Sequence, residues 1–202
     1  MVEVGRVAVT RPPRPSNPSL SALRLSSSPL LNTSPVLFSL SIRYIQLNMA
    51  NAAVVGGCAC GQVRYQSQEP AYGMSRCYCS TCRSVHGAPF ATFTNIKREN
   101  LRWIRDEGLT EVRLSTFATR TFCRSCSSPI TMVYDSLPEE IGIAAASIDE
   151  KASTAPLPNL ECHIYVDDKP SWYEILDKAP QRPGPTDYIR SLIEQGKAAH
   201  EK

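Results

Sequence analysis

Residues 77–82 read Cys-Tyr-Cys-Ser-Thr-Cys, which places three cysteines within six positions. Two cysteine pairs flank this stretch: residues 58–60 read Cys-Ala-Cys, and residues 123–126 read Cys-Arg-Ser-Cys. Seven of the eight cysteines therefore lie in three tight groups. Thiolates at C-x-C and C-x-x-C spacing converge on a soft metal ion, because a short turn brings both sulfurs to one side. The grouping predicts two zinc ions per chain.

The seven thiolates divide into a set of four and a set of three. A C-x-C pair on extended chain presents both sulfurs on one face, and a C-x-x-C knuckle also supplies two ligands. Joining the pairs predicts a closed site of Cys58, Cys60, Cys123 and Cys126. The remaining cysteines, Cys77, Cys79 and Cys82, then form an open site with a position free for water or substrate. The opposite division, in which the triple shares its ion with one distant cysteine, stays open, but it leaves another thiolate without a metal ion.

Other interpretations of the cysteines compete with zinc. A disulfide within C-x-C is badly strained, and the chain has no clean secretion signal. The spacings do not match the usual ferredoxin runs of iron–sulfur proteins. A structural role for both zinc ions stays open, because closed cysteine sites usually serve folding.

The charge is unevenly distributed along the 202 residues. Of the 22 basic and 19 acidic residues, five arginines and Glu3 lie in residues 1–48, which leaves 17 basic and 18 acidic residues in 49–202. A near-neutral domain lacks the basic surface expected of a nucleic-acid binder, so no nucleic-acid partner is expected. The apolar part of the first 48 residues is interrupted by Asn32, Pro35 and Arg43, so no membrane span is expected.

The chain divides into three regions. Residues 1–48, rich in Ser, Pro and Arg, predict a disordered leader. This leader is either a gene-model extension before Met49, which places the protein in the cytoplasm, or a mitochondrial transit peptide. Residues 49–180 predict one zinc-binding β domain, and residues 181–202 a tail that is helical from Tyr188 to Glu201.

Short strand-like segments punctuated by Gly and Pro predict a mainly β, mostly antiparallel domain. The expected strands are 62–66, 90–94, 101–104, 112–117, 130–134, 141–144, 163–166 and 172–175. Trp103 and Trp172 fall in two of these strands, and core packing is the favoured interpretation of both.

Several motifs resemble the family of glutathione-dependent formaldehyde-activating enzymes, which also contains centromere protein V. The likeness covers about residues 56–175 and is carried by residues 56–65 (Gly-Gly-Cys-Ala-Cys-Gly-Gln-Val-Arg-Tyr), 77–83, 87–90, 122–126, Ser128-Pro129, His163-Ile164 and Trp172. The resemblance implies a zinc-bound β-tent fold, a structural zinc at the closed site and a catalytic zinc at Cys77, Cys79 and Cys82, where glutathione binds. The chain departs from the family at Ser127, where a glycine is usual. A serine with positive φ there costs on the order of 1 kcal/mol.

The implied activity is that of a carbon–sulfur lyase. A thiol coordinated at the open site loses its proton and attacks an aldehyde such as formaldehyde, giving an S-hydroxymethyl adduct. Arg76 and Arg83 are candidates to bind the carboxylates of glutathione or a similar thiol, against the alternative of solvated surface arginines. His163 is a candidate to orient the ligand or carry a proton, against the alternative of a packing histidine. Cys162 has no implied role.

A different class of function stays open. Both zinc ions could be structural, and the domain could be a non-catalytic binding module for chromatin or microtubules. The near-neutral domain argues against this alternative, because phosphate and acidic tubulin attract a basic surface.

Overall fold

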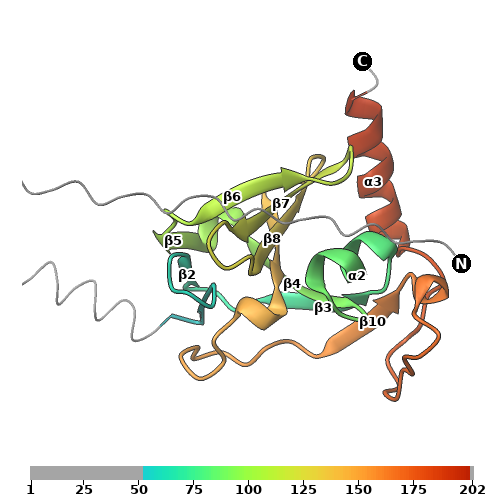
Figure 1. The fold of residues 1–202 in the computed structure, drawn as a ribbon, viewed down its shortest axis with the longest axis horizontal. Helices are drawn as coiled ribbons and strands as arrows, with labels where there is room; N and C mark the ends of the chain where they lie inside the picture. Colours follow the sequence, from blue (N-terminus) through green and yellow to red (C-terminus); the bar gives the residue numbers. More distant parts are fainter. Residues whose placement is uncertain (1–51, 201–202) are drawn as a thin grey trace, which may run out of the picture.

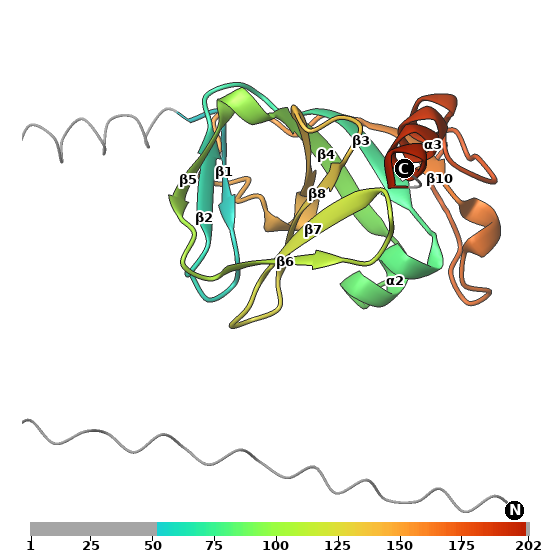
Figure 2. The same ribbon diagram turned by 90° about the horizontal axis from the view of Figure 1, so that it is seen from above.

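Short β-strands form most of the regular secondary structure in this computed structural model, which describes residues 52–200. Figures 1 and 2 show two sheets, the smaller one (β1, β2, β5) at one end of the molecule and helix α3 at the opposite end. The mainly β prediction is confirmed. The predicted leader, with its two alternative interpretations, lies outside the described residues.

The smaller sheet is antiparallel and has the strand order β1-β2-β5. Its strands are Val54–Gly57, Arg64–Ser67 and Leu101–Arg105. Because Val63 and Tyr65 are both fully buried, this sheet packs tightly on the rest of the domain.

The larger sheet has seven strands in the order β10-β3-β4-β9-β8-β7-β6. Its strands are β3 (Tyr72–Cys77), β4 (Ala91–Lys97), β6 (Leu109–Arg113), β7 (Ala118–Cys123), β8 (Pro129–Tyr134), β9 (Glu140–Ala144) and β10 (Leu160–Ile164). Neighbouring strands are antiparallel except for β10, which runs parallel to β3. The order brings the end of the domain beside the first cysteine of the triple, since Ile164 pairs with Cys77.

Within residues 52–200, two α-helices accompany the sheets. Helix α2 (Ser80–His86) begins directly after Cys79 and ends at Gly87, whose φ of 58° suits a glycine. This helix is not among the elements predicted from the sequence. Helix α3 (Asp187–His200) confirms the predicted C-terminal helix. Three short 3-10 helices complete the fold: Arg98–Asn100, Ala145–Ser147 and Val166–Asp168. No helix in residues 52–200 combines the length and apolarity needed to cross a membrane.

The buried residues form two core clusters, and each contains one group of cysteines. The first cluster holds Cys58 and Cys123 among side chains such as Tyr65, Ile130 and Ile143. The second holds Cys77 and Cys82 with apolar neighbours from β4, β9 and β10. The two cysteine groups therefore belong to separate parts of the core.

Two predicted strands are wrong. Residues 112–117 do not form one strand, because β6 ends at Arg113 and the chain turns before β7 begins at Ala118. Residues 172–175 form no strand, and Trp172 is 75% exposed, so its assignment to the core is corrected. Trp103 does pack on the first core cluster, with its ring edge-on to Tyr65.

Candidate metal centres and the adjoining cavity

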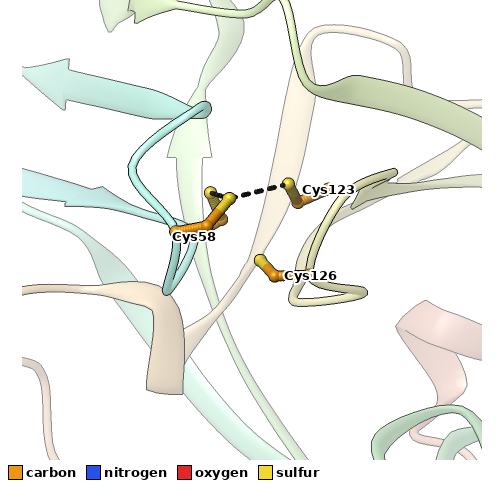
Figure 3. Close-up of side chains that lie close together, drawn as sticks. Cys58, Cys123 and Cys126 are labelled. Atoms are coloured by element: carbon orange, nitrogen blue, oxygen red, sulfur yellow. Dashed lines mark hydrogen bonds between the residues drawn. The ribbon is translucent and has the colours of Figure 1, made fainter. Parts of the chain in front are cut away.

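The four cysteines of the closed group come from two segments far apart in the chain. Cys58 and Cys60 follow strand β1, and Cys123 and Cys126 form the knuckle after β7. Figure 3 shows Cys58, Cys123 and Cys126 pointing toward one another, and the four Sγ atoms all lie within 4.8 Å of one another. The sulfur atoms are thus grouped as the sequence spacing predicts.

The sulfur distances fit a tetrahedral metal ion. The Sγ atom of Cys60 lies 3.5 Å from that of Cys58 and 3.6 Å from that of Cys123. Zn–S bonds of 2.3 Å in a tetrahedron separate sulfurs by about 3.8 Å, so little movement is needed to bind zinc. The Val63 amide donates to Cys58 Sγ, and such a hydrogen bond supports a thiolate. The Ser128 hydroxyl helps to lower the pKa of Cys126 to about 5.

Ser127 closes the knuckle in a left-handed conformation. Its φ is 61°, and its amide donates to the Cys123 carbonyl. The left-handed region costs an L-residue roughly 1–2 kcal/mol, part of which is offset because serine restricts the unfolded chain more than glycine does. Ser127, where the family usually has glycine, therefore has the positive φ that strains a serine.

We expect Ser127→Gly to raise the free energy of unfolding by about 1 kcal/mol, measured from urea transitions at fixed zinc. A matched control is Ser84→Gly on the exposed face of helix α2, which should lower stability by about 1 kcal/mol because glycine disfavours a helix. Equal shifts in the two variants would contradict strain at Ser127.

The three cysteines of the open group lie around the junction of β3 and helix α2. Cys77 ends β3, Cys79 caps the helix and Cys82 lies in its first turn, with all three Sγ atoms within 4.8 Å of one another. The Cys82 amide donates to Cys79 Sγ. Hydrogen bonds from Cys77 and Cys82 lower the pKa of Cys79, whereas those with Cys79 and Cys82 raise the pKa of Cys77. The group therefore already favours a thiolate at Cys79.

A cavity of about 530 Å³ opens beside this group, and all three cysteines line it. Its walls come from β3, β4, β7, β8, β10 and helix α3, which contributes Tyr188, Ile189, Leu192 and Ile193. The C-terminal helix therefore forms part of the cavity wall, a position that the predicted helical tail does not reveal. A cavity of similar size, about 520 Å³, lies near the closed group, but Cys58 is the only cysteine in its lining.

Arg120 is a functional candidate that the sequence analysis misses. It lies on β7, lines the cavity and is only 8% exposed. Its Nη2 donates to Cys82 Sγ over 3.5 Å, and its guanidinium lies 5.9 Å from the centre of the Phe93 ring. No ion pair joins Arg120 to a carboxylate within residues 52–200. Arg120 lies three residues before Cys123, the first cysteine of the knuckle, and this spacing in the sequence does not reveal a partner at Cys82.

Arg76 and His163 lie away from the cavity. In the paired strands β3 and β10, Arg76 is opposite His163, one residue before the pair of Cys77 and Ile164 that lines the cavity. Because strand side chains alternate, the two pairs face opposite sides of the sheet. The structure thus does not bring these two predicted ligand-binding residues to the open group.

Arg76 and His163 instead share Asp177. Arg76 Nη1 lies 2.8 Å from Asp177, and the fully buried His163 places Nε2 2.7 Å from Asp177 Oδ1 and Nδ1 3.0 Å from the Tyr78 hydroxyl. A carboxylate only accepts, so Nε2–H donates to Asp177, and Nδ1 accepts from Tyr78. The hydrogen bond with His163 lowers the pKa of Asp177. This network fixes Tyr78, the residue between two cysteines of the open group.

Arg83 and Cys162 lie near the open group but belong to neither cysteine group. Arg83 lies on helix α2, where its Nε donates to the Tyr78 carbonyl over 3.0 Å, and it is not part of the cavity lining. Cys162 does line the cavity, but its sulfur is not part of either cysteine group, and burial raises the pKa of its thiol.

The fold and site define a class: a small, mainly β protein with one closed and one open cysteine centre, the open one facing a cavity. Residues 53–168 match the model of the family described as glutathione-dependent formaldehyde-activating enzyme. The chain belongs to this family.

Two curated proteins and one solved structure are similar to this chain. A Halomonas elongata protein named "Putative glutathione-dependent formaldehyde-activating enzyme" is 29% identical over 139 residues, 63% of this chain and 83% of the relative. A Schizosaccharomyces pombe protein named as an uncharacterized lyase is 25% identical over 125 residues, 61% of this chain and 85% of the relative. A crystal structure of a Rhodobacter sphaeroides protein covers 63% of this chain and 98% of its own, with 25% identity and a TM-score of 0.39.

Proposed function

We propose that the protein is a zinc-dependent carbon–sulfur lyase that forms or cleaves the S-hydroxymethyl adduct between glutathione, or a similar thiol, and formaldehyde, or a similar aldehyde. The observation that carries the proposal is the convergence of three cysteine sulfurs in the wall of a cavity of about 530 Å³. Family membership and the lyase named among the relatives support the same class of reaction.

The open group has the donor set of a catalytic zinc site. Three thiolates from Cys77, Cys79 and Cys82 would leave one coordination position free, and all three cysteines line the cavity. Zinc bound there would lower the pKa of a substrate thiol, so that the thiol is deprotonated near neutral pH. Cys58, Cys60, Cys123 and Cys126 have the closed donor set of a structural zinc.

The reaction forms one carbon–sulfur bond. The substrate thiolate attacks the aldehyde carbon, the carbonyl π electrons move to the oxygen, and this oxygen takes up a proton equivalent to the one that the thiol released. The apolar side chains of Phe93, Met132 and Ile164 surround the reacting groups and limit the access of water. The reverse reaction breaks the same bond.

The far part of the cavity contains groups suited to an ammonium. Glu140 and Glu161 contribute carboxylates, and Asn95 lies beside Gly73, where an added Cβ would come within 3.3 Å of its Nδ2 atom. Asn95 lies four residues along β4 from Ala91, the partner of Cys77, or roughly 13 Å at 3.3 Å per residue. We propose that the amino end of glutathione points there. Arg120 is the only Arg or Lys in the described lining, so the glycyl carboxylate, at the opposite end of glutathione from the amino group, would lie toward the mouth.

We expect the purified zinc protein to accelerate exchange between free formaldehyde and its glutathione adduct, in proportion to protein concentration. Exchange NMR with and without the protein measures this rate directly. Protein with its zinc removed is the control, and its rate should equal the uncatalysed one. If stoichiometric zinc protein gives no acceleration, glutathione and formaldehyde are not its substrates. If a panel of other thiols and aldehydes also fails, the protein is not a lyase.

A binding titration against DNA and microtubules, beside the exchange experiment, separates the lyase from a non-catalytic binding module. A module that contacts chromatin or microtubules needs no cavity beside an open cysteine group. Salt-sensitive, tight binding of residues 49–202 to DNA or microtubules, without thiol chemistry, would favour the module.

A further inference from the structure

Arg120 is a buried cation whose hydrogen-bonding capacity is mostly unused. The guanidinium has five N–H donors, and one hydrogen bond, from Nη2 to Cys82 Sγ, is formed within residues 52–200. Among the described residues, the buried side-chain atoms without a hydrogen-bond partner are Arg76 Nε and Gln66 Oε1. No nitrogen of Arg120 is among them, so its nitrogens without a partner are not fully buried. Arg120 lines the cavity, so these free donors are available to a molecule inside it.

The open cysteine group explains the charge of Arg120 but not its free donors. A buried cation is stable only near a compensating negative charge. Three thiolates around a divalent ion carry a net charge of −1, which Arg120 balances. A counter-charge needs no particular orientation, and the side chain of lysine would serve. The remaining N–H groups of the planar fork are suited to an oxygen acceptor.

We propose that Arg120 binds the oxygen of the aldehyde and of the S-hydroxymethyl adduct. This inference rests on the proposed lyase function. When the thiolate attacks the aldehyde carbon, negative charge moves to an oxygen that is two bonds from the sulfur. The guanidinium of Arg120 already contacts the sulfur of Cys82, one of the three cysteines beside which the substrate thiolate would bind. The developing oxygen anion of the substrate would therefore be within reach of the guanidinium. A carboxylate of glutathione is several bonds farther from the sulfur.

Arg120 acts here as a hydrogen-bond donor and keeps its own protons. Donors placed where negative charge develops stabilise the transition state more than the ground state. The proton that completes the hydroxyl group comes from solvent, and in the reverse reaction it returns there.

Two small probes test this contact without turnover. Thioacetate presents a sulfur and an oxygen on one carbon, as the adduct does, and ethanethiol has no oxygen. The affinity of each probe is measured by calorimetry for the zinc-loaded wild-type protein and for Arg120→Met. Each probe is compared with itself across the two proteins, so the different acidities of the two thiols cancel. The loss of a positive charge affects both bound thiolates alike.

We expect Arg120→Met to weaken thioacetate binding by about 10- to 100-fold more than ethanethiol binding, the range of a charge-assisted hydrogen bond. Arg102→Met, at an exposed position on β5, is the control and should change neither affinity. Equal losses for the two probes would show that Arg120 only balances charge, and unchanged affinities would remove it from the site; either result overturns the inference.

Arg120→Lys keeps the proposal testable if the methionine variant does not fold or does not retain zinc. Lysine preserves the charge but not the planar fork. Thioacetate should then lose several-fold more affinity than ethanethiol, and parallel affinities would contradict the oxygen contact. Because neither probe is turned over, this outcome is independent of whether glutathione and formaldehyde are the substrates.

Discussion

Cys123→Ser is expected to abolish the cooperative folding of the domain. Cys123 is only 1% exposed, belongs to the first core cluster and joins a group whose other segment begins at Cys58. A metal bound there closes a loop of about 65 residues, so its binding free energy becomes folding free energy. Structural zinc contributes about 10–16 kcal/mol in small domains, comparable with the roughly 5–15 kcal/mol stability of a whole domain.

Circular dichroism and plasma mass spectrometry measure this loss of structure and of zinc together. Cys162→Ser is the matched control, because Cys162 lies outside both cysteine groups, and this variant should keep the wild-type melting transition and both zinc ions. A Cys123→Ser protein that melts cooperatively near the wild-type temperature would contradict a structural role for the closed group.

Cys79→Ser is expected to remove catalysis while leaving the protein folded. Cys79 is the N-cap of helix α2 and accepts a hydrogen bond from the Cys82 amide. Serine is among the preferred N-cap residues, so the substitution preserves the cap while it removes the sulfur ligand. The open group spans six residues, and a metal bound there constrains little of the chain. We expect about one zinc per chain and a loss of activity greater than about 100-fold.

Metal content and circular dichroism distinguish this variant from Cys123→Ser. Cys79→Ser should show a wild-type spectrum, loss of one zinc and no detectable thiol binding. If Cys79→Ser unfolds as completely as Cys123→Ser, the open group is also needed for folding. The division into a structural closed group and a catalytic open group would then be wrong.

The parts of the site predictable from sequence are those set by local spacing. The C-x-C and C-x-x-C pairs and the triple are fixed by bonds within a few residues, so their grouping follows without knowledge of the fold. The strands with clear alternation, such as residues 130–134, are found almost in place at Pro129–Tyr134. The turn between β6 and β7 is not evident in the sequence, because Leu114 continues the alternation from Val112 and the next residues include Thr116 and Phe117, which favour strands.

The cavity is a product of long-range contacts and could not be read from the sequence. Arg76 adjoins Cys77 in the sequence, but neighbours on a strand face opposite sides. Arg120 is 38 residues from Cys82, and only the order of strands in the larger sheet brings them together. The same applies to helix α3, whose apolar side chains are recognisable in the sequence but whose position over the cavity is not.

The most direct test of the catalytic role of the open cysteine group is the exchange rate between formaldehyde and its thiol adduct in wild-type and Cys79→Ser protein, measured at equal concentrations of folded chain. We predict that the wild-type protein accelerates exchange and that the folded variant, with its closed group still holding zinc, leaves the uncatalysed rate unchanged. A folded Cys79→Ser protein that accelerates exchange as well as the wild type would contradict the role assigned to Cys77, Cys79 and Cys82.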